Sequence, residues 1–333
     1  MFNIFCFVED PGASNFLIGL NKKKLNFHIF AKNYAIDYLE SYGIEYETNL
    51  KKIDFDNYDF FLIGTSESTK AIWPEIISRI KKKKIALLID TPTFVNERVS
   101  LINNVLKKKI NYFFIPDATC LSDLKVLGVK KERTFVVNPQ KFEYLSNIIK
   151  VKESSKIVFF TELSHGINKT KFLKDSDYQL DGFSNQVERT KIVLEEFILA
   201  VESIKKDFEL ILRIHPKESI ESYNNYLRFF DSFSDKGNNI KILSDCHLAV
   251  GLTSNVLAEA ASMGLNVLSI TPKKKEFDWI NSKYRTRIHH VYNKTKLHDF
   301  FINLPEKKKN LPKKSIHTYP LEETILKLLE SKL

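Results

Sequence analysis

Short apolar runs alternate along the chain with longer stretches in which apolar residues recur at helical spacing. Apolar runs that end at glycine, proline or aspartate are typical of buried strands, and amphipathic stretches between them are typical of helices. In the first half this pattern predicts strands at 2–8, 26–31, 60–63, 84–89, 112–115 and 134–137, and helices at 14–20, 34–42, 72–80 and 121–127. Such alternation predicts βαβ units and therefore a parallel sheet.

The same pattern restarts after residue 150. It predicts strands at 156–160, 209–214, 240–243, 248–250 and 267–270, and helices at 186–204, 223–233, 256–263 and 297–303. A lysine- and proline-rich stretch then leads to an amphipathic helix at 321–329. We expect two doubly wound α/β domains, 1–150 and 151–304, that face a central cleft, with a linker near 147–155. The tail, 305–333, is expected to pack back on the first domain.

The loop after the first predicted strand carries two acidic residues, Glu9 and Asp10. Ligands of doubly wound sheets bind outside the carboxyl ends of the strands, so this loop belongs to the expected cleft. Neighbouring carboxylates can supply a general base, because crowding raises the pKa of one of them. We predict a catalytic role here and prefer Asp10 as the base. A helix cap and a turn would also account for these residues.

Polar residues end two further strands of the first domain. Thr65 and Ser66 precede a predicted helix, where hydroxyl groups bind an anion or simply cap the helix. Asp90 can bind a hydroxyl group and Arg98 a carboxylate or phosphate, whereas an ion pair between the two would explain them equally well.

Two strand ends of the second domain carry candidate ligand contacts. Glu162 follows a buried strand and can accept hydrogen bonds from a sugar or a base; a solvated loop is the alternative. His215 leaves the next strand, and Pro216 fixes the turn after it. An imidazole held there can donate to a phosphate or ribose oxygen, and Lys217 adds a positive charge. A buried structural histidine is the simpler alternative.

The clearest phosphate site follows the strand at 248–250. Gly251 lets the backbone approach a ligand closely. Thr253, Ser254 and Asn255 present hydroxyl and N–H groups at the start of a predicted helix. Glu259, further along that helix, is placed to reach a ribose hydroxyl. A plain helix cap is the alternative, but the combination with the histidine–proline turn is more specific than either motif alone.

The second half resembles the nucleotide-binding domain of GT-B glycosyltransferases, most closely over residues 243–272. His215-Pro216 and Thr253-Ser254 are similar to the HP and Ser-Ser/Thr-Ser motifs of bacterial sialyltransferases, polysialyltransferases and Kdo transferases. In those families the two motifs hold the CMP part of a CMP-activated acidic sugar. The third motif of those families, two acidic residues and then glycine, is interrupted here by Pro11. The resemblance implies the GT-B fold of two Rossmann-like domains.

The resemblance also implies an activity. The chain would be a metal-independent glycosyltransferase without a cofactor, which moves a nonulosonic acid or Kdo from a CMP-activated nucleotide sugar to a cell-surface glycan, lipid-linked or protein acceptor. His215 would stabilise the departing phosphate, and Asp10 would deprotonate the acceptor hydroxyl. The acceptor would contact residues of the first domain, namely Gly12, Asn15, Thr65, Ser66, Asp90 and Arg98.

Three alternatives stay open. UDP-N-acetylglucosamine 2-epimerases share the fold and an HP-type motif, but their nucleotide loop reads Ser-Gly-Gly followed by paired acids. This chain has Ser254, Asn255 and Val256 there, followed by the single Glu259. CDP-polyol phosphotransferases share the HP and Ser-Ser features. A non-catalytic scaffold with a degenerate cleft is the third alternative.

The net charge of +10 has three explanations: a nucleic-acid partner, an anionic membrane, or the codon bias of an AT-rich genome. Only eight of the 51 basic residues are arginine, on whose planar fork nucleic-acid recognition relies, so we predict no nucleic-acid partner. The lysine runs 22–24, 81–84 and 107–109 would allow peripheral contact with an anionic membrane. Codon bias is the simpler explanation.

The sequence does not indicate a membrane span, a secreted protein, a disulfide framework or a cysteine metal site. No window of about 18 residues lacks a charge, and the opening segment lacks signal-peptide features. We therefore expect a cytoplasmic protein, at most peripheral at the inner face of the membrane. Cys6, Cys120 and Cys246 are odd in number and far apart, which excludes a disulfide framework and gives no metal-ligand spacing.

Overall fold

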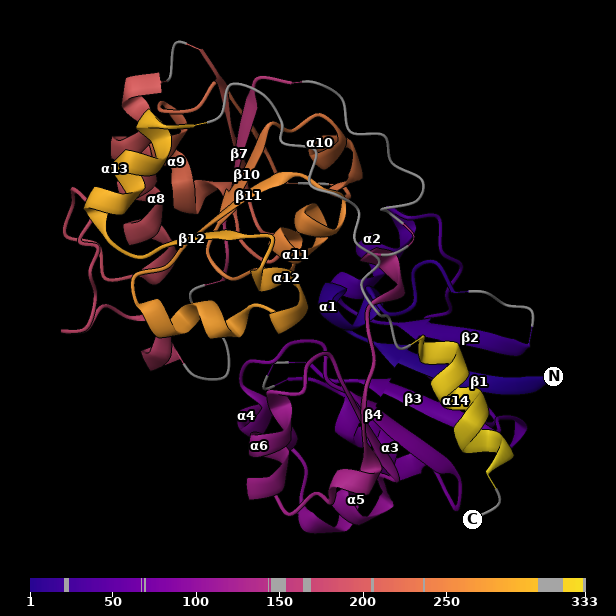
Figure 1. Ribbon diagram of the computed structural model, residues 1–333. Coiled ribbons are helices and arrows are strands. Elements are labelled where there is room, and N and C mark those ends of the chain that lie inside the picture. The colour runs from indigo at the N-terminus through magenta and orange to yellow at the C-terminus, as the bar shows by residue number, and fades with distance from the viewer. Residues whose placement is uncertain are drawn as a thin grey trace. The chain divides into compact units, whose positions relative to one another are not determined.

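The computed structural model describes residues 1–20, 24–66, 68, 70–142, 144, 154–163, 169–204, 207–235, 237–304 and 320–331. The chain divides into two compact units: unit 1 comprises Met1–Tyr144 with Ile316–Leu333, and unit 2 comprises Leu145–Ser315 (Figure 1). Each unit has its own six-stranded parallel sheet, so the predicted α/β class is confirmed. Most of the predicted linker and the stretch 305–314 lie outside the described residues, and the exact domain boundaries stay a prediction.

Unit 1 has the strand order β2-β1-β3-β4-β5-β6. Its strands are β1 (Phe2–Val8), β2 (Leu25–Ala31), β3 (Phe60–Gly64), β4 (Lys84–Leu88), β5 (Tyr112–Ile115) and β6 (Thr134–Val136). Its α-helices are α1 (Pro11–Ser14), α2 (Tyr34–Glu40), α3 (Trp73–Arg79), α4 (Val95–Val99), α5 (Asn104–Lys109), α6 (Cys120–Val126) and α14 (Leu321–Glu330). Short 3₁₀ turns lie at Leu50–Lys52, Phe55–Asn57 and Lys131–Arg133.

The core of unit 1 lies on both faces of its sheet. Successive residues of β1 alternate between two apolar clusters: Ile4 and Cys6 belong to one, and Phe5 and Phe7 to the other. Both faces are covered because a parallel sheet needs helices on each side. The cluster around Ile4 also contains apolar residues of α14, which lies along this sheet (Figure 1).

Unit 2 has the strand order β12-β11-β10-β7-β8-β9. Its strands are β7 (Lys156–Phe160), β8 (Glu209–Arg213), β9 (Ser232–Ser234), β10 (Leu248–Gly251), β11 (Asn266–Ile270) and β12 (His289–Val291). Its α-helices are α8 (Arg189–Val201), α9 (Asn224–Leu227), α10 (Ile240–Ser244), α11 (Asn255–Ser262), α12 (Ser282–Arg285) and α13 (Lys294–Ile302). Its 3₁₀ turns are Lys169–Phe172, Glu202–Ile204, Ile220–Tyr223 and Lys274–Trp279.

Two predicted elements of unit 2 are wrong. The apolar run 240–243 is the helix α10 and not a strand, because so short a run fits either period and the Asn238 side chain accepts the N–H of Ile240 at 3.0 Å. The predicted helix 223–233 ends early, and its last residues form β9, which pairs with β8. In unit 1, the helix predicted at 14–20 is also wrong, because α1 ends at Ser14 and residues 15–19 form turns.

Candidate functional site

The strand order identifies the place where each sheet is expected to bind a ligand. All strands are parallel, and successive strands are added on one side of β1 and then on the other, so the strand order reverses between β1 and β3 in unit 1. In unit 2 it reverses in the same way between β7 and β10. Ligands of doubly wound sheets bind at such switch points, beside the carboxyl ends of the strands. The predicted site residues of both units follow these four strands or their neighbours.

The Glu9 carboxylate forms structural hydrogen bonds within unit 1. Its side chain is almost fully buried and accepts the backbone N–H groups of Ile72 and Trp73 at 3.0–3.2 Å, together with the side-chain amide of Asn33 at 3.2 Å. These contacts satisfy donors at the start of α3, and the positive end of that helix stabilises the carboxylate. Both carboxylate oxygens of Glu9 have a structural partner, which indicates a structural role for this residue; the catalytic role of Asp10 stays a prediction.

Asp10 precedes α1, and its carbonyl oxygen accepts the N–H and the hydroxyl of Ser14 at 3.2 and 2.9 Å. The structure also brings together Gly12, Asp90 and Arg98. Asp90 and Arg98 form an ion pair of 2.5 Å in which both side chains are more than nine-tenths buried. A Cβ atom on Gly12 would lie 1.7 Å from Oδ2 of Asp90, so only glycine fits beneath that carboxylate.

Other predicted site residues of unit 1 form hydrogen bonds within that unit. The hydroxyl of Thr65 donates to the carbonyl of Leu88 at 3.1 Å, and that of Ser66 accepts the N–H of Ser68. Oδ1 of Asn15 accepts the hydroxyl of Tyr38 at 2.6 Å. These contacts hold the strand-end loops in place, and a role in acceptor binding stays a prediction.

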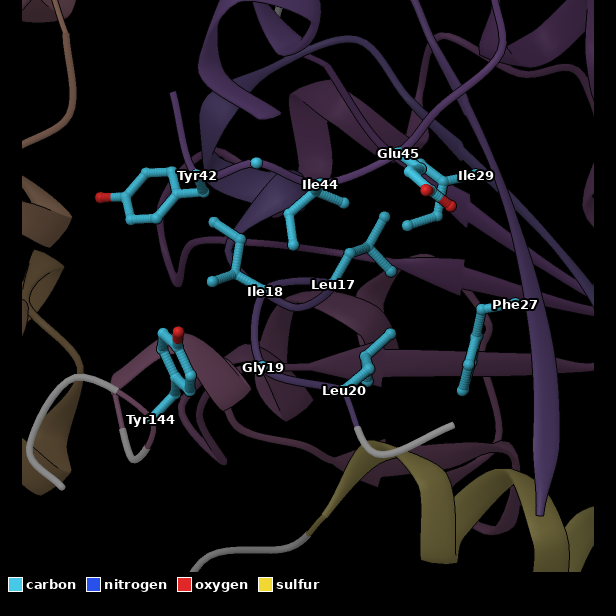
Figure 2. A pocket seen from close by; sticks show the side chains of 11 residues that line it. Leu17, Ile18, Gly19, Leu20, Phe27, Ile29, Tyr42, Ile44, Glu45 and Tyr144 are labelled. Atoms are coloured by element: carbon cyan, nitrogen blue, oxygen red, sulfur yellow. The ribbon is translucent and has the colours of Figure 1, made fainter. Parts of the chain in front are cut away.

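Unit 1 also contains an apolar pocket of about 360 Å³, away from the predicted residues. Leu17, Ile18 and Ile44 point toward its centre (Figure 2). The remaining lining residues include Phe27, Ile29, Tyr42, Glu45 and Tyr144.

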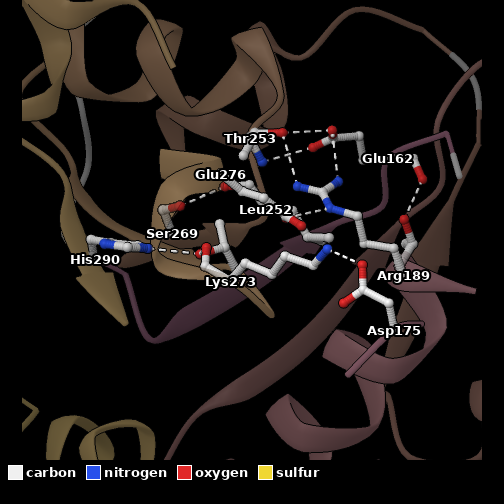
Figure 3. A network of polar contacts seen from close by, with 11 residues as sticks. Glu162, Asp175, Arg189, Leu252, Thr253, Ser269, Lys273, Glu276 and His290 are labelled. Carbon is white, nitrogen blue, oxygen red and sulfur yellow. Dashed lines mark hydrogen bonds and ion pairs between the residues drawn. The ribbon is translucent and has the colours of Figure 1, made fainter. Parts of the chain in front are cut away.

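In unit 2, Glu162 and Thr253 bind each other across the switch point. The Glu162 carboxylate accepts both the N–H and the hydroxyl of Thr253 at 2.7 Å. It also pairs with Arg189 at 3.0 Å (Figure 3). The two residues were predicted independently as ligand contacts, and in this structure each provides the partner of the other.

Arg189 lies at the centre of this network. Its fully buried guanidinium also bonds Glu276 at 2.6 Å and the Thr253 hydroxyl at 3.2 Å (Figure 3). The guanidinium carbon lies 5.0 Å from the ring centre of Trp279. Burial alone would lower the pKa of Arg189, but the carboxylates of Glu162 and Glu276 raise it. Arg189 and Glu276 were not among the predicted site residues, because in the sequence each has the appearance of an ordinary surface charge.

The histidine–proline turn is joined to the end of β7 through Thr161. The Thr161 hydroxyl accepts the N–H of His215 at 2.8 Å and donates to the carboxylate of Glu218 at 2.7 Å. Tyr223 donates to the other oxygen of Glu218 at 2.8 Å, and Nδ1 of His215 accepts the N–H of Lys217 at 3.1 Å. Burial raises the pKa of Glu218 to about 7, although the hydroxyls of Thr161 and Tyr223 oppose this shift.

The phosphate loop predicted after β10 opens α11. The Ser254 side chain caps this helix at the N–H of Val256, and Asn255 is its first residue. Gly251 ends β10 where a Cβ atom would lie 3.1 Å from the carbonyl oxygen of Phe160, and Glu259 is buried in the next turn of α11. The loop therefore has the predicted position at a helix start, and phosphate binding stays a prediction.

A second pocket, of about 320 Å³, borders the Arg189 network. Glu276 and Trp279 line it from the network side. Its other lining residues are Thr170, Lys171, Asp175, Lys273 and Lys275. Lys273 is paired with Asp175, so part of this positive charge is compensated (Figure 3).

The described residues contain no group of three or more His, Cys, Asp or Glu side chains arranged to hold a metal ion. No helix among them is both long and apolar enough to cross a membrane. Cys6, Cys120 and Cys246 are buried and form no disulfide with each other.

Comparison with known proteins identifies the fold. No protein-family model and no curated protein sequence matches the chain. Staphylococcus aureus MnaA, solved with UDP, is 11% identical with a TM-score of 0.62, covering 100% of this chain and 99% of that one. The Neisseria meningitidis UDP-GlcNAc 2-epimerase bound to UDP-GlcNAc is 11% identical with a TM-score of 0.61, covering 98% and 100%. Anabaena Alr3699/HepE, solved with UDP and glucose, is 14% identical with a TM-score of 0.55, covering 93% and 91%. This chain therefore has the GT-B-like fold that the sequence predicted.

Proposed function

We propose that this chain is a nucleotide-sugar enzyme whose unit 2 binds the UDP part of a UDP-activated sugar. One observation carries the proposal: the His215 turn and the Thr253–Ser254 loop, predicted separately as phosphate contacts, are linked through adjacent residues at the end of β7. Full-length structural similarity to proteins solved with UDP or UDP-GlcNAc supports UDP as the nucleotide.

UDP takes the place of CMP as the first candidate nucleotide. The three similar structures described above were solved with UDP or UDP-GlcNAc, and none of them was solved with a CMP-activated sialic acid or Kdo. The CMP donor is retained as a second candidate, because His215-Pro216 and Thr253-Ser254 still match the motif pair of the CMP-sugar transferases.

Two reactions are candidates for the bound sugar. Epimerisation at C2 of UDP-GlcNAc is favoured by the several epimerase structures that share the fold. Glycosyl transfer is favoured by α11, whose single acid, Glu259, stands where the epimerase pattern has paired acids. We take epimerisation as the first reaction to test.

Nucleotide choice is tested by isothermal titration calorimetry with UDP, CMP, CDP and GDP. We expect selective binding of UDP, weakened at least tenfold by His215→Ala and by Ser254→Ala, because a hydrogen bond to a charged group contributes about 1.5–3 kcal/mol. Selective binding of CMP would overturn UDP in favour of the transferase resemblance. Binding of none of the four would favour the non-catalytic scaffold.

The reaction is tested by proton NMR of UDP-GlcNAc incubated with the protein in D₂O. Epimerisation is expected to produce a second set of anomeric signals with exchange at C2, and both are expected to persist in EDTA because no metal is proposed. Release of UDP only when a glycan acceptor is added would identify a transferase instead. Loss of turnover in EDTA would contradict metal independence.

A further inference from the structure

We propose that Thr161 and Glu162, the two residues directly after β7, are positioning residues that hold the two nucleotide-binding loops of unit 2 at a fixed separation. This inference rests on the proposed function, in which the His215 turn and the Thr253–Ser254 loop hold one nucleotide. It changes the role of Glu162 from a ligand contact to a support for the residues that make the contact.

The sheet order explains why these two residues can serve both loops. β7 lies between β10 and β8, and all three strands are parallel, so their carboxyl ends meet at one edge. At this edge Thr161 bonds to the loop after β8, and Glu162 bonds to the loop after β10.

The Thr161 hydroxyl holds the His215 turn because it accepts one hydrogen bond from the turn and donates another to it. Its hydroxyl accepts the His215 N–H at 2.8 Å and donates to Glu218 at 2.7 Å, while its own N–H donates to the carbonyl of Arg213 at 2.9 Å. The N–H of Glu218 donates a hydrogen bond to the carbonyl of His215 at 2.8 Å, which closes the turn. The side chain of Thr161 is buried, so these bonds do not compete with water. The orientation of the His215 backbone therefore depends on this hydroxyl.

Glu162 holds the Thr253 loop with both carboxylate oxygens. One oxygen accepts the Thr253 N–H and the other accepts its hydroxyl, both at 2.7 Å. Arg189 compensates the charge of Glu162 at 3.0 Å and is held in turn by Glu276. Thr253 thus presents both donors to a carboxylate of its own chain, and a phosphate is expected to meet the groups that follow, beginning at Ser254.

The test measures UDP affinity by calorimetry and loop geometry by amide NMR on the full-length chain. Thr161→Val and Glu162→Gln are each expected to weaken UDP binding about tenfold or more, and Thr161→Ser to stay within about twofold of wild type, because it restores the hydroxyl. Thr161→Val should shift the amide signal of His215, and Glu162→Gln that of Thr253. Thr161→Ala replaces Thr161→Val if the added methyl prevents folding.

Matched controls come from exposed positions of the same unit. Thr286→Val and Glu202→Gln make the same chemical changes outside the network and should leave UDP affinity within about twofold. Wild-type protein that does not bind UDP would overturn the proposed function, whereas the amide signals would still report the two contacts. Wild-type protein that binds UDP, with Thr161→Val and Glu162→Gln binding equally well, would overturn the positioning role. Failure of Thr161→Ser to retain binding would overturn it too.

Discussion

Arg189 is a buried cation between two buried or half-buried carboxylates. Moving an ion out of water is costly, and the guanidinium is tolerated here because Glu162 and Glu276 both accept hydrogen bonds from it. The ring of Trp279 lies within cation–π distance of the same group. Since both carboxylates share one arginine, removing it takes away the cation that is paired with each of them.

Replacing this arginine should therefore destabilise unit 2. Arg189→Met is expected to lower the free energy of unfolding by about 3–5 kcal/mol, the usual cost of breaking a buried ion pair by removing one partner. Urea denaturation measures this change. Arg228→Met, at an exposed position of the same unit, is the control and should cost less than about 1 kcal/mol. Equal effects of the two substitutions would contradict the structural role of Arg189.

Glu218 makes the stability of unit 2 depend on pH. Its pKa rises from an ordinary 4.5 to about 7, first because it is buried and also because Glu162 and Glu188 repel its charged form. The folded protein therefore binds this proton more tightly than the unfolded chain does. The contribution of Glu218 to stability is full below pH 4.5 and is lost as the pH rises toward 7, by about 3 kcal/mol in total.

Glu218→Gln removes this dependence. We expect the free energy of unfolding of Glu218→Gln, relative to wild type, to increase between pH 5 and pH 8. Denaturation at a series of pH values measures the difference. A difference that stays constant over this range would show that Glu218 does not titrate there.

The turn α1 shows how one element is fitted to another. Gly12 lies beneath Asp90, and Gly64 at the end of β3 leaves room for Ala13, whose Cβ would be 2.7 Å from a Cβ at that position. Gly12 and Gly64 thus let α1 approach the carboxyl ends of β3 and β4. This close approach places the Asp10 loop directly over the switch point of the sheet.

A side chain at Gly12 should break this fit. Gly12→Ala puts a methyl group 1.7 Å from Oδ2 of Asp90, so the Asp90–Arg98 ion pair or α1 has to move. We expect a loss of about 2–3 kcal/mol in the free energy of unfolding. Gly128→Ala, where no atom lies within 4 Å and only a positive φ opposes the substitution, should cost about 1 kcal/mol. Chemical denaturation of both variants measures which substitution lowers the free energy of unfolding more. A smaller loss for Gly12→Ala than for Gly128→Ala would contradict this packing.

Several lysines of the basic runs have structural partners at helix ends. Lys109 donates to the carbonyls of Ser78 and Ile80 at the end of α3, at 2.8 and 3.1 Å. Lys84 donates to the carbonyl of Leu328 in the last turn of α14 at 2.5 Å. Cations are favoured at the carboxyl ends of helices. Part of the charge that first suggested a membrane surface is therefore used inside unit 1, and membrane contact stays a prediction.

At the scale of the whole molecule, the C-terminal helix α14 completes unit 1. Leu321, Ile325 and Leu328 are spaced along one face of the helix and belong to the same apolar cluster as β1 and β3. Residues from the two ends of the chain thus share one core, and the last residues are needed for the stability of the first domain.

Truncating a core residue of α14 tests this conclusion. Ile325→Ala is expected to lower the free energy of unfolding by about 2–5 kcal/mol, since it removes a fully buried side chain and leaves a cavity. Hydrogen exchange should become faster in the peptides of β1 and β3. Ile302→Ala, at an exposed position of α13, is the matched control and should have little effect. Unchanged exchange in β1 and β3 would contradict a shared core.

The sequence by itself determined most strands, the parallel class of both sheets and the loops in which functional residues were sought. These features are local: they depend on side-chain periodicity and on turn residues, which neighbouring positions specify. Failures such as α10 and β9 occurred in short runs that fit either period.

Only the tertiary structure decided which partner each polar side chain has. Glu9 caps a helix 63 residues away, Glu162 holds a loop 91 residues away, and Arg189 binds Glu276 at a separation of 87 residues. Such pairs depend on which strands are neighbours in the sheet, and the order of strands along the chain does not specify that. A charged residue has the same appearance in the sequence whether it meets water, a ligand or a distant partner, because its desolvation is set by the folded surroundings.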